Sequence, residues 1–239
     1  MSIILKQGDR SEEVVLLQKA LNELAGFNLS KDGDFGPGTR NSLRSFQQRA
    51  NYNVDGIYDS NVHIELADLI ERKYIRLNDI AQYADAIGVE PAFLKAVTVV
   101  ESRGSGFFDN GMCAILYERH IFYNKVAAKF GKKKADQWAS KYPNLCYPTR
   151  SQAAYYGGER EYERLNQAKN LDSECALLSA SYGMFQIMGF NYAVCGYETV
   201  GDYVADMIES ERYHVGAVSL LIKNQPSWLA PARNLDFNE

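Results

Sequence analysis

No run of apolar residues in this 239-residue sequence approaches the ~18 residues that a membrane-spanning helix needs. The first residues also lack the charged leader and apolar stretch of a signal peptide. We therefore expect a chain made in a cytosol, with no export signal of its own and no stable membrane insertion. The 46% hydrophobic and 23% charged residues are typical of a globular protein with one large or two smaller domains.

Cysteine and histidine are few and scattered. The four cysteines form no Cys-x-x-Cys pair, and the three histidines form no His-Glu-x-x-His motif. Since zinc sites depend on such spacings, we expect no metal site, and reduced, mostly buried thiols. No histidine accompanies a serine or cysteine in a recognisable nucleophile arrangement, which disfavours a Ser or Cys hydrolase.

The net charge of −4 conceals an uneven distribution. Residues 119–164 carry 10 Lys/Arg against 4 Asp/Glu, and residues 165–239 carry 4 against 9. The run Lys132-Lys133-Lys134 fits either an anionic polymer or a solvated helix face. Basic and aromatic residues are not interleaved as in a nucleic-acid-binding platform, so we expect no nucleic-acid partner.

Residues 1–73 contain an internal repeat. Ser11 is a typical N-cap for a helix whose apolar residues run to Leu24, and Gly26 ends it. Two Asp-Gly turns, Asp32-Gly33 and Asp55-Gly56, lie 23 residues apart, and each precedes a further helical pattern. The repeat predicts a compact three-helix bundle with both turns near one rim.

An aromatic residue, Phe35 or Tyr58, follows each of these glycines by two positions. On an exposed rim such rings would pack on a sugar or peptide, and aspartates would supply hydrogen bonds. Packing of both rings in the core is the alternative, because the spacing alone does not distinguish the two.

The same region is similar to a known family. The runs Gly8-Asp9-Arg10…Leu17-Gln18 and Asp32-Gly33-x-Phe35-Gly36-x-x-Thr39…Phe46-Gln47 resemble the three-helix peptidoglycan-binding domain of bacterial cell-wall hydrolases. The resemblance implies that Asp32, Asp34, Phe35 and Tyr58 contact peptidoglycan. The second repeat departs from the pattern, since Asp59 and Val62 stand where the first has Gly36 and Thr39.

A helix is predicted over residues 91–101. Pro91 suits its first position, and apolar residues recur at helical spacing from Phe93 to Val100. Glu101 lies four residues after Val97 and therefore on the same face, just before two glycines that end the helix. Burial there would raise its pKa and suit it to act as a general acid. The alternative is a solvated Glu101, or one paired with Arg103.

Three other segments have recognisable patterns. Asn78 is predicted to cap a helix that Gly88 ends. Residues 114–123 form an apolar run, interrupted by Glu118 and Arg119, that fits a short strand or hairpin leading into a helix. Residues 200–222 read as one or two helices.

Gln186 lies within an apolar segment, residues 179–191, and its amide needs hydrogen-bond partners there. A sugar hydroxyl or amide would provide them, and an internal backbone partner is the alternative.

Three motifs of this region belong together: Val100-Glu101-Ser102-Arg103-Gly104, Leu116-Tyr117-Glu118-Arg119-His120 and Ser181-Tyr182-Gly183-Met184-Phe185-Gln186-Ile187. Together they resemble the N-acetylmuramidase domain of phage endolysins, in the lysozyme superfamily.

This resemblance implies a mainly α fold: an α+β lysozyme-like catalytic domain with a small hairpin, after the three-helix peptidoglycan-binding bundle. The expected boundaries are 1–73 for the binding domain, 74–78 for a linker and 79–239 for the catalytic domain. Relatives run on through a Tyr-Asn-Gly segment and a final helix, so the C-terminal end at 236–239 is expected to be short.

By the same resemblance Glu101 is the catalytic acid, and Gln186, Ser181, Tyr182 and Gly183 line the sugar cleft. The implied function is an endolysin that hydrolyses the MurNAc–GlcNAc β-1,4 bond of Gram-negative peptidoglycan, without a cofactor and as a monomer. It would be made in the host cytoplasm and reach the periplasm and wall through a holin-type lesion. A lytic transglycosylase giving anhydro products, or a non-catalytic wall-binding or virion protein, remain alternatives.

Glycoside hydrolysis usually needs a second carboxylate, as base or nucleophile. Two candidates follow Glu101 at short distance, Asp109 in the predicted loop and Glu118 in the apolar run. We favour Glu118, because a carboxylate that interrupts an apolar run is less ordinary than a solvated loop aspartate. The alternative for Glu118 is an ion pair with Arg119 or a neighbouring arginine.

Overall fold

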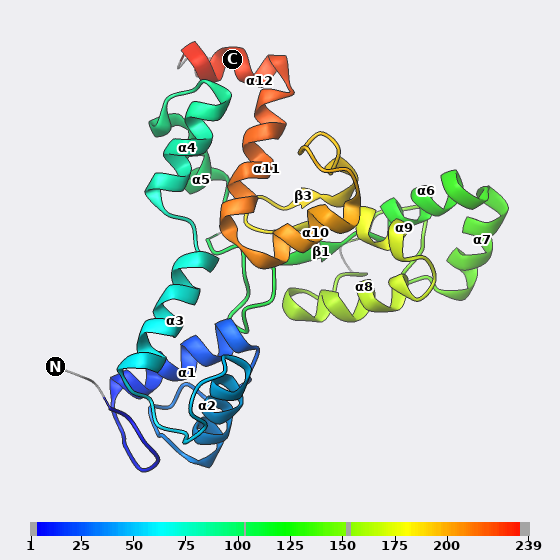
Figure 1. Cartoon of the computed structure of the whole chain (residues 1–239). Coiled ribbons are helices and arrows are strands. Elements are labelled where there is room, and N and C mark those ends of the chain that lie inside the picture. The colour runs from blue at the N-terminus through cyan, green and yellow to red at the C-terminus, as the bar shows by residue number, and fades with distance from the viewer. Residues whose placement is uncertain (1–3, 103, 152–153, 235–239) are drawn as a thin grey trace. The chain divides into compact units, whose positions relative to one another are not determined.

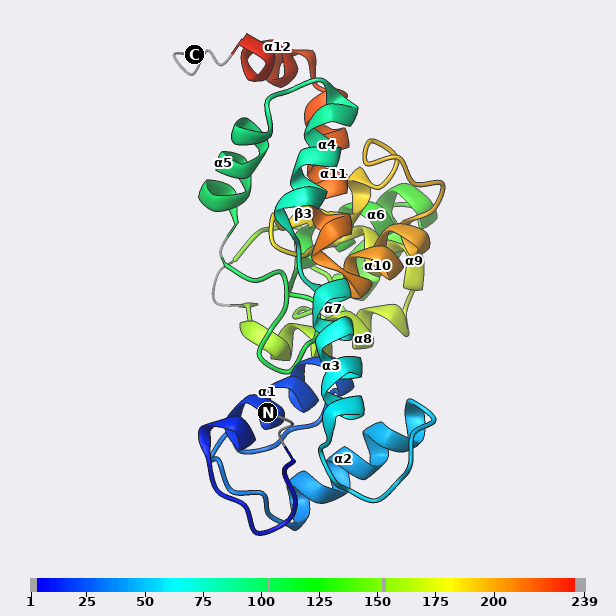
Figure 2. The same ribbon diagram turned by 60° about the vertical axis from the view of Figure 1, so that its left-hand side comes forward.

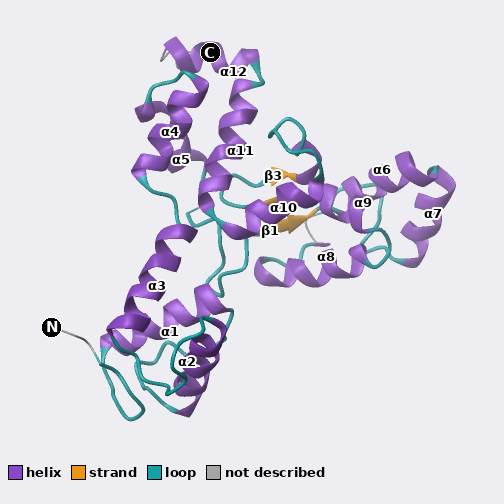
Figure 3. Ribbon diagram, in the orientation of Figure 1, coloured by secondary structure: helices purple, strands orange, loops and turns teal. Residues whose placement is uncertain are grey.

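The computed structural model describes residues 4–102, 104–151 and 154–234. The chain divides into two compact units, one of Met1–Tyr74 with Phe107–Met112 and one of Ile75–Gly106 with Cys113–Glu239. Helices dominate, and the three described strands belong to the second unit (Figure 3). This confirms the predicted mainly α class with a helical bundle and a small sheet. None of the described helices is long and apolar enough to cross a membrane.

The first unit is a bundle of three described helices, drawn in blue to cyan in Figure 1: α1 (Glu12–Ala25), α2 (Pro37–Arg49) and α3 (Ser60–Lys73). The caps predicted for α1 are present. The Ser11 side chain accepts a hydrogen bond from the Val14 N–H, and Gly26 ends the helix with φ +67. The apolar faces of the three helices enclose one core, which includes Leu17, Leu21 and Leu43.

The two aromatic residues of the repeat belong to this core. Phe35 has no exposed surface and Tyr58 is 9% exposed, so the prediction that both rings lie on an open rim is wrong. The core alternative is the one that the structure adopts, because both rings belong to the same apolar cluster as the buried leucines of the helices. The Tyr58 hydroxyl lies 2.7 Å from His63 Nδ1, a partner from the next helix.

A buried glutamine holds each Asp-Gly turn. In the first repeat, Gln18 Nε2 donates to Asp32 Oδ1 at 2.9 Å, and its Oε1 accepts the Gly33 N–H at 3.0 Å. In the second repeat, Gln47 Nε2 donates to Asp55 Oδ1 at 2.9 Å, and its Oε1 accepts the Gly56 N–H at 2.8 Å. Both turn glycines have φ near +75, which favours glycine. Asp32 is therefore a structural residue of the turn, and Asp34 pairs with Arg10 at 2.9 Å.

The second unit contains the other helices and the sheet. Its regular elements are α4 (Leu77–Ile87), α5 (Pro91–Glu101), β1 (Ile115–Tyr117), α6 (Arg119–Phe130), α7 (Lys132–Lys141), η2 (Gly158–Arg160), α8 (Glu161–Lys169), α9 (Ser173–Leu178), β2 (Ala180–Tyr182), β3 (Ile187–Met188), η3 (Gly189–Asn191), α10 (Val200–Glu209), α11 (Glu211–Lys223) and α12 (Pro226–Asn234).

Two details at the start and end of this unit differ from expectation. α4 begins at Leu77, within the stretch predicted as linker, and its N-cap residue is Arg76 rather than Asn78. The Asp79 carboxylate accepts the Arg76 N–H at 3.1 Å, so the cap is supplied from inside the helix. α12 is a further helix beyond the last one predicted from the sequence.

The two long helices α4 and α11 pack side by side (Figure 1 and Figure 2). Gly216 of α11 permits this approach, because a Cβ there would lie 3.0 Å from the Tyr83 ring of α4. The sheet has the antiparallel order β1-β2-β3, with Leu116 opposite Ser181 and Tyr182 opposite Ile187. It therefore pairs strands from the two predicted motif segments, residues 114–123 and 179–191.

We predict that Gln47→Leu destabilises the chain, because it leaves the Gly56 N–H and the Asp55 carboxylate without their buried partner. The expected loss is about 1–3 kcal/mol of unfolding free energy, measured by urea unfolding followed by circular dichroism. Gln48→Leu is the matched control, since the neighbouring Gln48 is exposed, and it should stay within about 0.5 kcal/mol of wild type. Equal losses in both variants would contradict a role for the Gln47 hydrogen bonds.

Candidate active site

Glu101 is the last residue of α5, and its side chain is exposed. The prediction that it lies on a buried face is wrong. The buried residues of α5 are Leu94 and Thr98, one turn apart, while Val100 is 75% exposed. Burial thus ends after Thr98, and residues 99–101 are exposed. The Glu101 side chain makes no hydrogen bond or ion pair with another described residue; Arg103, its predicted alternative partner, lies outside the described part of the chain.

The loop after Glu101 is held by two buried side chains of α11. Glu211 is 4% exposed, and its Oε1 accepts the Gly106 N–H at 2.7 Å. The ring of His214 packs against the same glycine, because a Cβ on Gly106 would lie 2.3 Å from His214 Nδ1. Gly183, in the turn between β2 and β3, also packs against this ring, since a Cβ there would lie 2.8 Å from its carbon atoms. Glu211 and His214 thereby fix the loop of Glu101 against the turn of the sheet.

The polar contacts of His214 define its protonation state. Its Nδ1 accepts the Met184 N–H at 3.3 Å, and its Nε2 lies 2.7 Å from the Met207 carbonyl oxygen. This pattern fits a neutral imidazole with the proton on Nε2. Burial lowers the pKa of His214 to about 4.

Glu118, the favoured second carboxylate, lies directly between β1 and α6. Its backbone N–H donates to the Ser179 carbonyl at 2.8 Å, which extends the pairing of β1 with the segment before β2. The side chain is only 9% exposed, yet it has polar neighbours. The Tyr155 hydroxyl lies 2.9 Å from Oε1 and 2.8 Å from Oε2, and Arg150 is 3.8 Å from Oε1.

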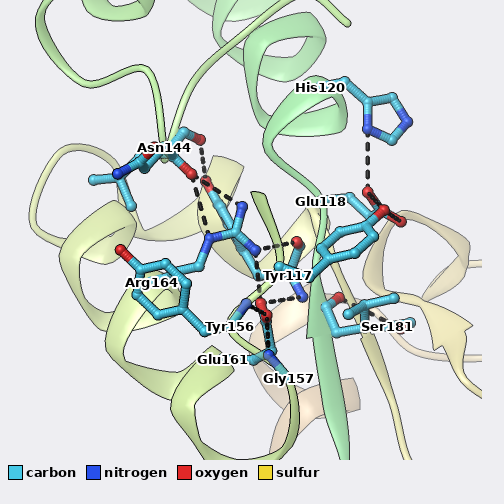
Figure 4. Close-up of polar contacts among 12 residues, drawn as sticks. Tyr117, Glu118, His120, Asn144, Tyr156, Gly157, Glu161, Arg164 and Ser181 are labelled. Atoms are coloured by element: carbon cyan, nitrogen blue, oxygen red, sulfur yellow. Dashed lines mark hydrogen bonds and ion pairs between the residues drawn. The ribbon is translucent and has the colours of Figure 1, made fainter. Parts of the chain in front are cut away.

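His120 is the third polar neighbour of Glu118 (Figure 4). Its Nδ1 lies 3.2 Å from Oε2, close enough for an ion pair when the ring is protonated. The same buried nitrogen has no aligned hydrogen-bond partner among the described residues. The alternative predicted for Glu118, an ion pair with an arginine, is also found. The arginine is Arg150, at 3.8 Å, and not Arg119.

Asp109, the other candidate, belongs to the first unit. Its side chain is 91% exposed and lies 3.1 Å from Lys31 Nζ. Glu118 instead shares the second unit with Glu101. This common unit favours Glu118 over Asp109 as the partner of Glu101, and the assignment remains a prediction.

The residues predicted to line the cleft make mostly internal contacts. Gln186 Nε2 donates to the carbonyls of Gly183 and Ala114, at 2.8 and 3.1 Å, and the Ser181 hydroxyl donates to Gln186 Oε1 at 2.8 Å. Tyr182, predicted to bind substrate, is instead a core residue with 2% exposure. The alternative of internal partners for Gln186 is therefore what the structure shows.

A buried ion pair, which was not predicted from the sequence, lies against the backbone of Tyr117, next to Glu118. Glu161 and Arg164, one turn apart on α8, have no exposed side-chain surface, and Arg164 Nη1 lies 2.7 Å from Glu161 Oε2 (Figure 4). Arg164 also donates to the carbonyls of Tyr117 and Asn144. The other carboxylate oxygen, Glu161 Oε1, accepts the N–H groups of Tyr156 and Gly157 at 2.6 and 3.0 Å.

The roles of other residues were also not predicted. Gln18 and Gln47 belong to the runs that resemble the binding domain, and their repeated position, after an apolar residue in the helix before each Asp-Gly turn, was a signal for their role. No local pattern marks Tyr155, whose partner Glu118 lies 37 residues away in the sequence. Among the described residues, no three His, Cys, Asp or Glu side chains converge as metal ligands would.

Comparison with known proteins assigns both parts of the chain. Residues 90–239 match the family model of N-acetylmuramidases, and residues 10–64 match the model of a peptidoglycan binding domain. A search of curated proteins returned no match. Among solved structures, the crystal structure of the Burkholderia AP3 phage endolysin is 34% identical in sequence, with a TM-score of 0.64. The match covers 98% of this chain and 88% of that one.

The fold and these matches define a glycoside hydrolase that acts on peptidoglycan, preceded by a peptidoglycan-binding module. The chain belongs to the N-acetylmuramidase family.

We predict that Arg164→Met is strongly destabilising, because Glu161 would keep a buried charge without its counter-ion. The expected loss is about 3–5 kcal/mol in urea unfolding at pH 7. Arg160→Met is the matched control, since Arg160 and Glu163 have the same spacing on the surface and a separation of 3.7 Å. That variant should change stability by less than about 1 kcal/mol, and similar losses from the two pairs would refute the importance of burial.

A second prediction concerns the pH dependence of folding. In the unfolded chain His214 binds a proton below its ordinary pKa of 6.5, whereas in the folded chain it stays neutral down to about pH 4. Stability should therefore decline as pH falls from 6.5 to 4, with a contribution from His214 of about 3 kcal/mol. Urea unfolding at a series of pH values would measure this slope, and His214→Gln should reduce it. An unchanged slope in a folded His214→Gln variant would be evidence against the assignment.

Proposed function

We propose that this chain is a phage endolysin that hydrolyses the β-1,4 bond between MurNAc and GlcNAc in bacterial peptidoglycan. The observation that carries the proposal is the N-acetylmuramidase match over residues 90–239, which contains both Glu101 and Glu118. The 34% identity to a phage endolysin over 98% of the chain supports the lytic role. The module at residues 10–64 would hold the enzyme on its insoluble substrate.

The two carboxylates would divide the chemistry. Glu101 is exposed at a helix end, where a glycosidic oxygen can approach it, and a bound sugar would exclude water and favour the neutral acid. Its proton passes to the leaving oxygen as the bond from that oxygen to the anomeric carbon breaks. Glu118, at the end of β1, provides the negative charge that stabilises the cationic sugar or directs the attacking water.

The route to the substrate is part of the same proposal. The enzyme would accumulate in the host cytoplasm as a monomer and reach the wall after a lesion forms in the inner membrane. Its target would be the thin peptidoglycan of a Gram-negative host.

We predict that Glu101→Gln keeps the fold and lowers the lytic rate by about 10²-fold or more, because an amide cannot donate the acid's proton. Turbidity loss of outer-membrane-permeabilised Gram-negative cells would measure the rate. Glu90→Gln is the control, since Glu90 is exposed at the other end of the same helix, and it should retain wild-type activity.

The released fragments would separate the reaction types. Reducing ends, found by mass spectrometry, support a hydrolase, whereas 1,6-anhydro ends would identify a lytic transglycosylase. Lysis by Glu101→Gln at the wild-type rate would remove Glu101 from the mechanism. Wall binding without cleavage by the wild-type chain would leave only the binding role.

A further inference from the structure

Glu118 is buried, and among the described residues one side chain, that of Tyr155, makes aligned hydrogen bonds to its carboxylate. The Tyr155 hydroxyl lies within 2.9 Å of both carboxylate oxygens. His120 Nδ1 is near but not aligned, and Arg150 lies at 3.8 Å. A buried carboxylate that keeps its charge needs a hydrogen-bond donor, because burial otherwise disfavours ionisation. Tyr155 is the residue that meets this need.

Tyr155 is itself fixed by its neighbours. Arg150 Nε donates to its hydroxyl oxygen at 3.1 Å, so the phenol proton is directed toward Glu118. Burial, the larger cause, and the Glu118 hydrogen bond both raise the pKa of Tyr155, which keeps the phenol protonated as a donor.

The backbone next to Tyr155 is held from the interior. The N–H groups of Tyr156 and Gly157 both donate to Glu161 Oε1, and Glu161 is held by Arg164. These contacts form one series, from the buried ion pair through the backbone after Tyr155 to its hydroxyl and Glu118. The series thus links α8 to Glu118 at the junction of β1 and α6.

We infer that Tyr155 is a positioning residue for catalysis: through its hydroxyl it orients the Glu118 carboxylate, the second carboxylate of the proposed muramidase reaction. The inference rests on the proposed function, because it assigns Glu118 a place in that reaction. Tyr155, whose hydroxyl is held by Arg150, is thereby added to the residues that determine the rate of bond cleavage.

Tyr155→Phe removes only the hydroxyl and tests this role. Because the lost hydrogen bond is to a charged group, we expect kcat to fall about tenfold or more. KM should stay within about twofold of wild type, since Tyr155 acts through Glu118 and does not contact the substrate. Rates would be measured on solubilised peptidoglycan fragments, beside thermal unfolding. Tyr147→Phe is the matched control, because Tyr147 is 40% exposed and uses its ring to stack on Arg119. It should match wild type.

The decisive comparison uses a Glu118→Gln background, with products counted by mass spectrometry after long incubation. If Tyr155 acts through Glu118, Tyr155→Phe should not lower the residual rate of Glu118→Gln further. An equal loss in both backgrounds would mean a general structural effect and would overturn the inference. A wild-type rate for Tyr155→Phe beside an impaired Glu118→Gln would also overturn it and leave the proposed function intact.

Full activity of Glu118→Gln would overturn both the inference and the role given to Glu118. The Glu101→Gln variant then decides separately whether the muramidase proposal survives. The two failures are thus distinguishable.

Discussion

The backbone around the candidate active site depends most on the buried ion pair between Glu161 and Arg164. Neither side chain has exposed surface, so each charge must be satisfied within the protein. Arg164 binds carbonyls of β1 and of the segment after α7, while Glu161 binds two N–H groups just before η2. A buried pair of this kind costs desolvation energy, which the additional hydrogen bonds offset. Its effect is to fix irregular backbone around Glu118.

In the first unit, glutamine side chains hold irregular backbone in a similar way. Gln18 and Gln47 each satisfy the carboxylate and the glycine N–H of one Asp-Gly turn. The amide has one acceptor and a donor group at the right separation to bind both ends of such a turn. This explains why the internal repeat extends to the glutamines, although the residues after the second turn differ from those after the first.

Elements with local signals could be predicted from the sequence, and features that depend on distant neighbours could not. The caps at Ser11 and Gly26, the end of α4 at Gly88 and the strand before Glu118 follow from residue type and spacing. Helical periodicity placed Glu101 on the apolar face of α5 but did not show that burial ends after Thr98. The core positions of Phe35 and Tyr182 and the contact of Tyr155 with Glu118 depend on packing between segments far apart in sequence.

The two candidate carboxylates end up in opposite environments. Glu101 is exposed and has no polar partner among the described residues, whereas Glu118 is buried beneath a tyrosine, an arginine and a histidine. A group that must donate a proton to an incoming sugar benefits from access, and one that must keep a fixed negative charge benefits from oriented donors. Because the loop after Glu101 and the backbone around Glu118 are each held by buried carboxylates, Glu211 and Glu161, the contrast between the two is built into the fold. It fits an acid and a charge-stabilising partner better than two interchangeable carboxylates.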